Sequence, residues 1–584
     1  MAISSVSAVN LEELKWETNN EDPPIGSEKA KRGGTYYDSI SAYPLTFRLY
    51  GPNSNDAFAG WNRSYAISTF NLVLRHPSTD RFIPCLATHW SVQDDQRTIY
   101  FRLDPDARWT DGKPITADDY VFSHQFQQTK NFPLPFYNRY MEDYFESVEK
   151  IDDHTLKIVG TKRSWRPLDD YNFVPLPRHD MQTDADWPVR DNYKPPVVPG
   201  PYIISAWKEG ERVEFKRREQ WWGESKRYFT GMFNVDRIVL RVINQNDRAF
   251  DYFKKGELSF YPILSARMWS TQMEFDALKN GWVHRKRLFL DYPQGMYGLV
   301  MNLNTPIFQS KDFRKAVQHL FNFKELNDKL MYGAYYRQVS AFEGTEYANS
   351  KLKAYPFNPR NAREHLVKAG FSKRGRDGIL EGSGGRKASF TVIFGSKTFE
   401  RHMTVIQNTF KRAGIEMKLR LLEPGAAFEK GLEKAFEMQL FSRTAGFYPD
   451  PHQYFSSEFK EVKQNNNIWS FGDPEVDRLI DIYRYDLDKK KRQEAMVKID
   501  EIIQDSAFYI PFWKAPFLRF LYWDYVQFPD TFFPKRTQQP LDYQVFWIDE
   551  DRRKRLEDAK RNNTSLGEDK VIDIDPYGVK AAMD

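Results

Sequence analysis

Adjacent carboxylate side chains could act as an acid–base pair, but the pairs in this chain have ordinary structural explanations. Asp118-Asp119 and Asp152-Asp153 are two examples. The first begins a predicted helix and the second lies in a predicted turn, both ordinary structural places for aspartate. No Gly-x-Ser-x-Gly elbow lies on a predicted strand, and Gly112-Lys113 lacks the upstream glycine of a phosphate loop. These residues favour binding over catalysis, and we expect the protein not to be an enzyme.

Metal and cofactor chemistry also lacks its usual residues. The ten histidines are scattered, without the pair on one helix face that zinc enzymes use. Cys85 is the only cysteine, so the sequence excludes an internal disulfide, a zinc–thiolate cluster and an iron–sulfur site. We therefore expect no metal and no cofactor.

The composition indicates a folded protein with many aromatic side chains. Hydrophobic residues make up 41% of the 584 residues, so the chain can build real cores and is not intrinsically disordered. Aromatic residues make up 16%, and ligand-binding sites are often lined by such residues. Lysine plus arginine exceed aspartate plus glutamate by 85 − 80 = 5, with the two signs interspersed. That charge pattern argues against a nucleic-acid partner.

The sequence shows neither a membrane span nor an export signal. No window approaches the roughly 18 apolar residues of a spanning helix. The first residues, Met1 to Ser5, have neither the basic nor the apolar region of a signal peptide. Two locations stay open: the cytosol, or the periplasm after removal of a signal.

The elements predicted for the first half are mainly strands and hairpins. A strand over 98–103 leads through the Asp111-Gly112 turn into a helix whose N-cap is Thr116. Residues 197–223 are predicted to form a hairpin whose returning strand, 212–216, alternates strictly, and 235–243 form a further strand.

The second half alternates strands with helices, as α/β layers do. Asn358-Pro359 and Asp473-Pro474 each combine an N-cap with a proline in the first turn, and so each opens a helix. Strands over 388–394 and 417–422 flank a helix over 398–412.

Five segments, taken in order, resemble family 5 extracellular solute-binding proteins, the oligopeptide- and dipeptide-binding subunits of ABC importers. The resemblance runs from about Gly33 to about residue 545. The similar segments are a Pro-x-Leu-Ala-x-x-Trp step at 84–90, an Asp-Gly turn and helix start at 107–120, a Gly-Pro-Tyr hairpin ending in Trp-Trp-Gly at 200–223, an Asn-Leu-Asn segment leading to Arg-Lys-Ala at 302–316, and a Gly-Asp-Pro helix opening at 472–479. Each segment is weak alone, and their common order carries the resemblance.

The resemblance implies an α/β fold of two lobes, the type II-like periplasmic-binding-protein fold, with an extra subdomain in lobe I and two hinge crossings. A solute that contacts both lobes of such a fold stabilises its closed form. We expect the crossings near 296–303 and 515–523. The implied divisions are an extended arm at 1–32, lobe I at 33–300 with an inserted subdomain at about 70–195, lobe II at 301–522, a return to lobe I at 523–548, and a charged, solvated tail at 549–584.

The resemblance also points to one loop as the ligand contact. In peptide-binding members, a Trp-x-x-Asp-x-x-Asp/Glu-Pro loop supplies a carboxylate to the free amine of the peptide. The similar segment is 443–451, in which Asp450-Pro451 matches the acidic-proline step. Phe447 stands at the amine-binding position, where a phenyl ring offers only a cation–π contact of about 0.5–2 kcal/mol. Arg443 presents a fork that suits a carboxylate, phosphate or sugar acid, and an ion pair with a neighbouring carboxylate would explain it equally well.

Further candidates for ligand contact are aromatic and amide side chains. Tyr448, like Phe447, is a candidate for stacking on a ligand or for packing as a lid. The remaining candidates are Trp469, Asn467, Trp513 and Tyr43.

The resemblance implies a substrate-binding component that captures a peptide or peptide-like solute between two lobes and delivers it to the permease subunits of an ABC importer. An oligosaccharide is the second expected solute, because of the aromatic residues and the missing aspartate. Two other classes stay open. One is a glycan-active hydrolase with two carboxylates about 5–9.5 Å apart, and the other is a chaperone-like module with broad, weak binding. We expect a periplasmic monomer, and the sequence leaves a lipid anchor open.

Overall fold

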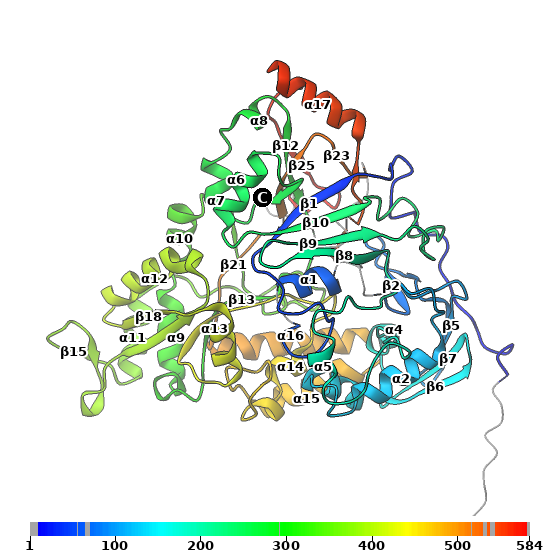
Figure 1. Cartoon of the computed structure of the whole chain (residues 1–584). Helices are drawn as coiled ribbons and strands as arrows, with labels where there is room; N and C mark the ends of the chain where they lie inside the picture. The colour runs from blue at the N-terminus through cyan, green and yellow to red at the C-terminus, as the bar shows by residue number, and fades with distance from the viewer. Residues whose placement is uncertain are drawn as a thin grey trace, which may run out of the picture. The chain divides into compact units, whose positions relative to one another are not determined.

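The structure of the chain, a computed structural model, describes residues 10–54, 57–64, 70–290, 292–515, 517–529, 534–537 and 544–580. The chain divides into two compact units, and Figure 1 labels their helices and strands. Unit 1 contains Met1–Pro262, Glu274–Arg287 and Arg519–Pro576, and unit 2 contains Ile263–Met273, Leu288–Leu518 and Tyr577–Asp584.

A four-stranded sheet in unit 1 contains the hairpin that the sequence alternation predicts. In the antiparallel pair β8–β9, Ile204 lies opposite Phe215. Val213 and Phe215 point to the same face of β9 and are fully buried, because side chains alternate between the faces of a strand. The connecting turn uses Gly210 at φ +71°, a left-handed conformation that glycine adopts without strain. The strand order is β1 (Thr35–Ile40), β10 (Arg237–Val242), β9 (Arg212–Arg217) and β8 (Tyr202–Lys208), with β1 parallel to β10.

A second four-stranded sheet of unit 1 lies within the segment predicted as an inserted subdomain. The helix predicted to begin after Thr116 is α2, and the Asp119 carboxylate accepts a hydrogen bond of 3.0 Å from the Thr116 backbone N–H. Trp109 is buried and donates from Nε1 to the same carboxylate at 3.3 Å. The strand order is β4 (Ala87–Val92), β5 (Thr98–Leu103), β7 (Thr155–Gly160) and β6 (Phe145–Asp152), accompanied by α2 (Ala117–Gln127) and α3 (Pro135–Tyr144).

The C-terminal segment forms regular structure, which differs from the solvated tail that its charge predicts. Helix α17 buries Leu556 and Ala559, so two apolar positions anchor an otherwise charged helix. The Arg285 guanidinium pairs with Asp569 at 2.7 Å, just before the last strand. These residues are therefore charged and mostly exposed, but they are anchored by two apolar side chains and an ion pair rather than being solvated throughout. The elements are α17 (Glu550–Asn562) and a sheet of order β11 (Phe260–Pro262), β22 (Phe517–Trp523), β12 (Val283–Phe289) and β25 (Val571–Ile574).

Unit 2 contains a five-stranded sheet in which strands and helices alternate as predicted. β17 pairs parallel with β18 and with β19, and α12 connects β17 to β18 as in a βαβ unit. β13 runs antiparallel to both β19 and β20. The strand order is β18 (Glu416–Leu421), β17 (Ser389–Phe394), β19 (Met438–Arg443), β13 (Met296–Met301) and β20 (Tyr509–Pro511).

Two pairs of helices in unit 2 pack against each other: α9 with α11, and α15 with α16 (Figure 1). The predicted caps are present, because Asn358 and Asp473 accept hydrogen bonds from the first backbone N–H groups of α11 and α15. The helices are α9 (Lys311–Leu320), α10 (Phe323–Leu330), α11 (Pro359–Lys368), α12 (Glu400–Arg412), α13 (Pro424–Leu432), α14 (Pro451–Phe455), α15 (Pro474–Tyr485) and α16 (Lys489–Ser506).

Shorter elements complete the described parts of both units. In unit 1 they are α1 (Ala57–Ser64), β2 (Val73–Arg75), β3 (Phe82–Pro84), α4 (Pro167–Asp170), α5 (Trp187–Arg190), α6 (Asn246–Lys254), α8 (Asp276–Lys279), β23 (Val526–Gln527) and β24 (Trp547–Ile548). In unit 2 they are α7 (Ala266–Thr271), η1 (Pro306–Gln309), β14 (Tyr336–Arg337), β15 (Lys373–Arg374), β16 (Leu380–Glu381), η2 (Ser383–Gly385), η3 (Lys397–Phe399), η4 (Ser457–Phe459) and β21 (Trp513–Lys514).

The chain passes between the units at positions that differ in part from the expected hinges. It enters unit 2 after Arg287 and leaves it after Leu518, while 263–273 and the residues after Pro576 also belong to unit 2. The passage after Leu518 lies inside the expected 515–523. The expected crossing at 296–303 was wrong, because these residues form β13 within the sheet of unit 2. Among the described residues, no helix has the length and apolar character needed to cross a membrane.

Candidate functional site

The predicted ligand loop begins where β19, an interior strand of the unit 2 sheet, ends. Alternation along β19 puts Gln439, Phe441 and Arg443 on one face of the sheet. Arg443 lies opposite Met296 of β13, so a paired strand holds its backbone. The paired strand therefore fixes the position of the Arg443 backbone at the start of the loop.

Among the described residues, the Arg443 guanidinium has polar and aromatic neighbours but no acidic partner. Its Nη2 donates to Asn466 Oδ1 at 3.2 Å, and its centre lies 4.9 Å from the ring centroid of Phe428. Its Nε is buried without a hydrogen-bond partner. Burial lowers the pKa of Arg443, and Tyr454 acts in the opposite direction. No carboxylate among the described residues lies within 4.0 Å of the guanidinium, so the ion-pair alternative was wrong for this part of the chain.

A chain of hydrogen bonds connects Arg443 to the acidic-proline step of the loop. Asn466 Nδ2 donates to Gln453 Oε1 at 2.7 Å, and Gln453 Nε2 donates to Asp450 Oδ2 at 2.8 Å. Asp450 is also the N-cap of α14 and accepts from the Gln453 backbone N–H. Asp450 thus caps this helix and orients Gln453, and its contact with a ligand stays a prediction.

Phe447 and Tyr448 lie in the loop between Arg443 and Asp450, and both are half-buried. Their rings meet edge to face at 4.8 Å, and Tyr448 also contacts Tyr347 at 6.4 Å. Tyr483 of α15 donates to the Pro449 carbonyl at 2.9 Å and fastens the same loop. The loop is thus supported by aromatic packing, and its half-buried rings leave surface for a ligand.

Two of the predicted ligand residues, Trp469 and Asn467, lie in the core of unit 2. Trp469 is fully buried and packs on Phe441, with ring centroids 5.2 Å apart. Asn467 is also fully buried, and its side chain exchanges hydrogen bonds with the backbone N–H and carbonyl of Phe471 at 3.0 and 2.8 Å. Both side chains serve the structure of the unit, and we leave them out of the proposed site.

The last two predicted ligand residues lie on separate elements. Trp513 of β21 stacks on Phe512 at 4.7 Å and is 8% exposed, so only an edge of the indole reaches the surface. Tyr43 belongs to unit 1 and is half-buried, and burial is the main cause that raises its pKa. For both residues, ligand contact stays a prediction.

Sequence reasoning missed Gln453 and Asn466, which link Arg443 to Asp450. A local signal was present for Gln453, because an acidic N-cap followed three residues later by Gln is typical of a capped helix start. Residues 465–467 are all asparagine, so the sequence could not predict which of them contacts Arg443. Only the fold turns Asn466 toward Arg443 and buries Asn467.

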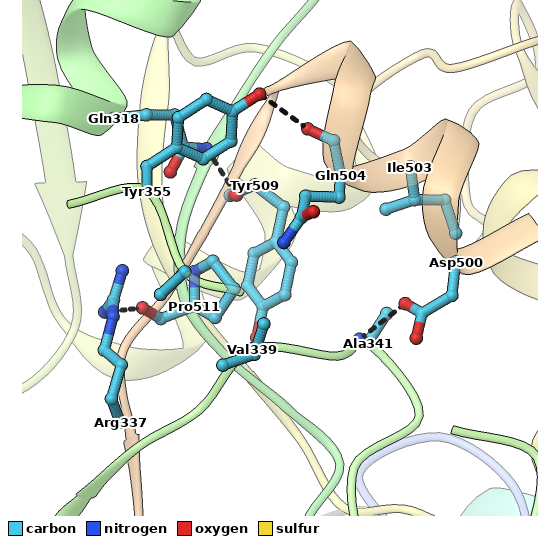
Figure 2. A pocket seen from close by; sticks show the side chains of 11 residues that line it. Gln318, Arg337, Val339, Ala341, Tyr355, Asp500, Ile503, Gln504, Tyr509 and Pro511 are labelled. Carbon is cyan, nitrogen blue, oxygen red and sulfur yellow. Dashed lines mark hydrogen bonds between the residues drawn. The ribbon is translucent and has the colours of Figure 1, made fainter. Parts of the chain in front are cut away.

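A cavity elsewhere in unit 2, with both polar and apolar lining, is too small for a solute. Figure 2 shows Asp500 of α16, Tyr355 and Arg337 around it. Its volume of about 20 Å³ holds about one water molecule. Asp500 accepts from Ser340 Oγ at 2.5 Å and from the Ala341 backbone N–H at 3.1 Å, so this cavity belongs to the anchoring of a neighbouring segment.

Solved structures show the same fold as this chain. It is similar to the oligopeptide-binding protein AppA of Bacillus subtilis, solved with a nonapeptide, at 20% identity and a TM-score of 0.74, covering 89% of this chain and 100% of that chain. It is also similar to the periplasmic binding protein DppA of Helicobacter pylori, solved with the peptide STSA, at 18% identity and a TM-score of 0.71, covering 89% and 98%. The fold is that of periplasmic binding proteins, as predicted.

The family follows from the sequence comparison. The model of bacterial extracellular solute-binding proteins, family 5, matches residues 81–466, and the chain belongs to this family. Two of the similar proteins come from Agrobacterium fabrum. A probable peptide-binding protein, YejA, is 25% identical over 89% of this chain and 90% of its own length. A peptidoglycan-binding protein, YepA, is 24% identical over 75% and 78%.

Proposed function

We propose that this solute-binding protein is the substrate-binding component of an ABC importer, and that its solute is a peptide or peptide-like molecule carrying an acidic group. The observation that supports the acidic group is the Arg443 guanidinium, which is largely buried at the start of the ligand loop without a carboxylate partner among the described residues. A guanidinium that is buried without a carboxylate partner binds the carboxylate of a ligand strongly, because charge-assisted hydrogen bonds gain strength where water is scarce.

The similar proteins support the peptide part of the proposal. One relative is named as a probable peptide-binding protein, and two structural neighbours were solved with bound peptides. The proposed protein acts as a monomer in the periplasm and hands its solute to the permease subunits of the importer.

An oligosaccharide is the second candidate solute. Phe447 stands where peptide-binding members place the carboxylate for the free amine, and aromatic rings such as Trp513 stack on sugars. A peptidoglycan-binding relative supports this candidate, since peptidoglycan contains both sugars and peptides.

The solute can be identified without choosing candidate compounds beforehand. Native mass spectrometry of freshly purified protein is expected to show a co-purified mass, and a thermal-shift screen of acidic peptides, neutral peptides and oligosaccharides follows. We expect acidic peptides to give the largest rise in melting temperature. A rise with oligosaccharides alone would reject the peptide proposal.

The role of Arg443 is tested by substitution. Arg443→Ala is expected to weaken binding of an acidic solute about 10- to 100-fold, since a hydrogen bond to a charged group contributes about 1.5–3 kcal/mol. Binding of neutral solutes should change little. Arg420→Ala, at an exposed arginine of β18, is the matched control. Equal affinities of Arg443→Ala and the control for acidic solutes would remove Arg443 from the site.

A further inference from the structure

Unit 1 contains an apolar pocket to which the proposed function assigns no role. Its volume is about 60 Å³, against about 20 Å³ for the cavity of unit 2. Two proline-bearing segments, 174–177 and 196–199, form walls of the pocket, and Trp109 and Trp187 add aromatic surface. The prolines fix the backbone of these walls, so the pocket is largely formed before any ligand enters.

Arg48 brings a positive charge into this apolar lining. The residue is 7% exposed, and its guanidinium lies 5.6 Å from the ring centroid of Trp187. Nη1 donates to the Tyr50 carbonyl at 2.7 Å, and Nη2 donates to the Pro52 carbonyl at 2.8 Å and to Asn192 Oδ1 at 3.2 Å. All three acceptors are neutral, so they satisfy hydrogen bonds without balancing the charge.

The hydrogen-bonding capacity of Arg48 is only partly used. A guanidinium has five N–H donors, and the three bonds leave two of them over. One of the two is Nε–H, which is buried without a partner. Burying a charge without a counter-charge is costly, so a buried arginine in this state favours an anion nearby.

The acidic side chains of the pocket do not supply the counter-charge that Arg48 lacks. Asp180 pairs with Lys194 at 2.7 Å, and Asp191 lies 3.9 Å from Arg190. Asp191 acts on Arg48 only at longer range: burial lowers the pKa of Arg48, and Asp191 opposes that shift. Within the described part of the chain, no carboxylate lies within 4.0 Å of the Arg48 guanidinium.

We propose that this pocket of unit 1 binds a small organic anion that joins an apolar body to one carboxylate. Arg48 supplies the positive charge, and the aromatic and proline side chains supply the apolar walls. This site is distinct from the Arg443 loop, which belongs to unit 2.

Three probes with the same body separate charge from apolar contact. They are 4-phenylbutyrate, 4-phenylbutan-1-ol and 4-phenylbutylamine, titrated into the full chain by calorimetry. We expect the carboxylate to bind about tenfold more tightly than the alcohol, and the amine to bind more weakly still. Equal affinities for the carboxylate and the alcohol, or tighter binding of the amine, would overturn the proposal. This comparison needs no variant and therefore no assumption about folding.

A pocket-filling variant tests the location. Val197 is half-buried in the wall, so Val197→Trp is expected to fill the space and lower carboxylate affinity at least tenfold. Val571→Trp makes the same change at an exposed position of β25 and should leave the affinity unchanged. Unaltered binding in Val197→Trp would overturn the proposal. Displacement of phenylbutyrate by the solute of the Arg443 loop would also overturn it, because the two sites would then be one.

Discussion

At the scale of single residues, we propose that Phe447 determines whether the ligand loop recognises a free amine. It occupies the position at which peptide-binding members of the family carry a carboxylate, and its ring packs on Tyr448. We expect Phe447→Asp to make peptides with a free N-terminus bind about tenfold more tightly than their N-acetylated forms, because it introduces a charge-assisted hydrogen bond. Phe447→Leu is the control, and calorimetry with both peptide forms is the measurement. A wild-type protein that already prefers the free amine to this extent would contradict the prediction.

Asp500 is a second residue with a measurable effect, because its protonation makes the free energy of unfolding depend on pH. It is 1% exposed, and burial raises its pKa to about 6, against hydrogen bonds from Ser340, Asn349 and Ala341 that lower it; the charge of Glu343 raises it further. Because its pKa is higher in the folded state than in the unfolded state, folded protein holds the proton more tightly between about pH 4 and 6. The contribution of Asp500 to the free energy of unfolding is therefore fully present below about pH 4 and is lost as the pH rises through 6, by about 3 kcal/mol.

The test compares two aspartates of the same helix. Asp500→Asn should lose less stability than the wild type between pH 4.5 and pH 7.5, as measured by urea unfolding at each pH. Asp505 is exposed and pairs with Lys311 and Lys315, which lower its pKa. Its contribution has the opposite sign: it is present at neutral pH and is lost as the pH falls. Because that loss occurs only below about pH 4, Asp505→Asn should follow the wild type between pH 4.5 and pH 7.5, and identical trends in the two variants would contradict the assignment.

At the scale of elements, the cap of α15 supports the ligand loop from a distance. Asp473 accepts from the backbone N–H groups of Glu475 and Val476 at 2.9 and 3.3 Å, and Tyr483 near the other end of the helix holds Pro449. We expect Asp473→Ala to lower the free energy of unfolding by about 1 kcal/mol and to speed hydrogen exchange over 474–485, whereas Asp473→Ser retains a cap. Exchange that stays as slow in Asp473→Ala as in Asp473→Ser would argue against this support.

Local signals explain which elements the sequence could predict. The caps at Asn358 and Asp473 and the alternation within the hairpin predicted at 197–223 act over a few residues, so the helices and the hairpin appear where expected. The first hinge was misplaced because the role of β13 depends on pairing with β19 and β20, far along the chain. For the same reason, the sequence identified Arg443 and Asp450 but not the hydrogen bonds through Asn466 that join them.

At the scale of the whole molecule, binding without conversion separates a receptor from a glycan-active hydrolase. The family and the fold are those of solute-binding proteins, whose ligands stabilise the folded state by mass action. We expect the identified solute to raise the free energy of unfolding by about 2.7 kcal/mol at a concentration 100 times its dissociation constant. Differential scanning calorimetry over a concentration series measures this rise, and mass spectrometry of the solute after prolonged incubation should return its original mass. Arg443→Ala should require a higher concentration for the same rise. Products that accumulate with time in the wild type would show turnover and would assign the molecule to the enzymes, whatever its fold.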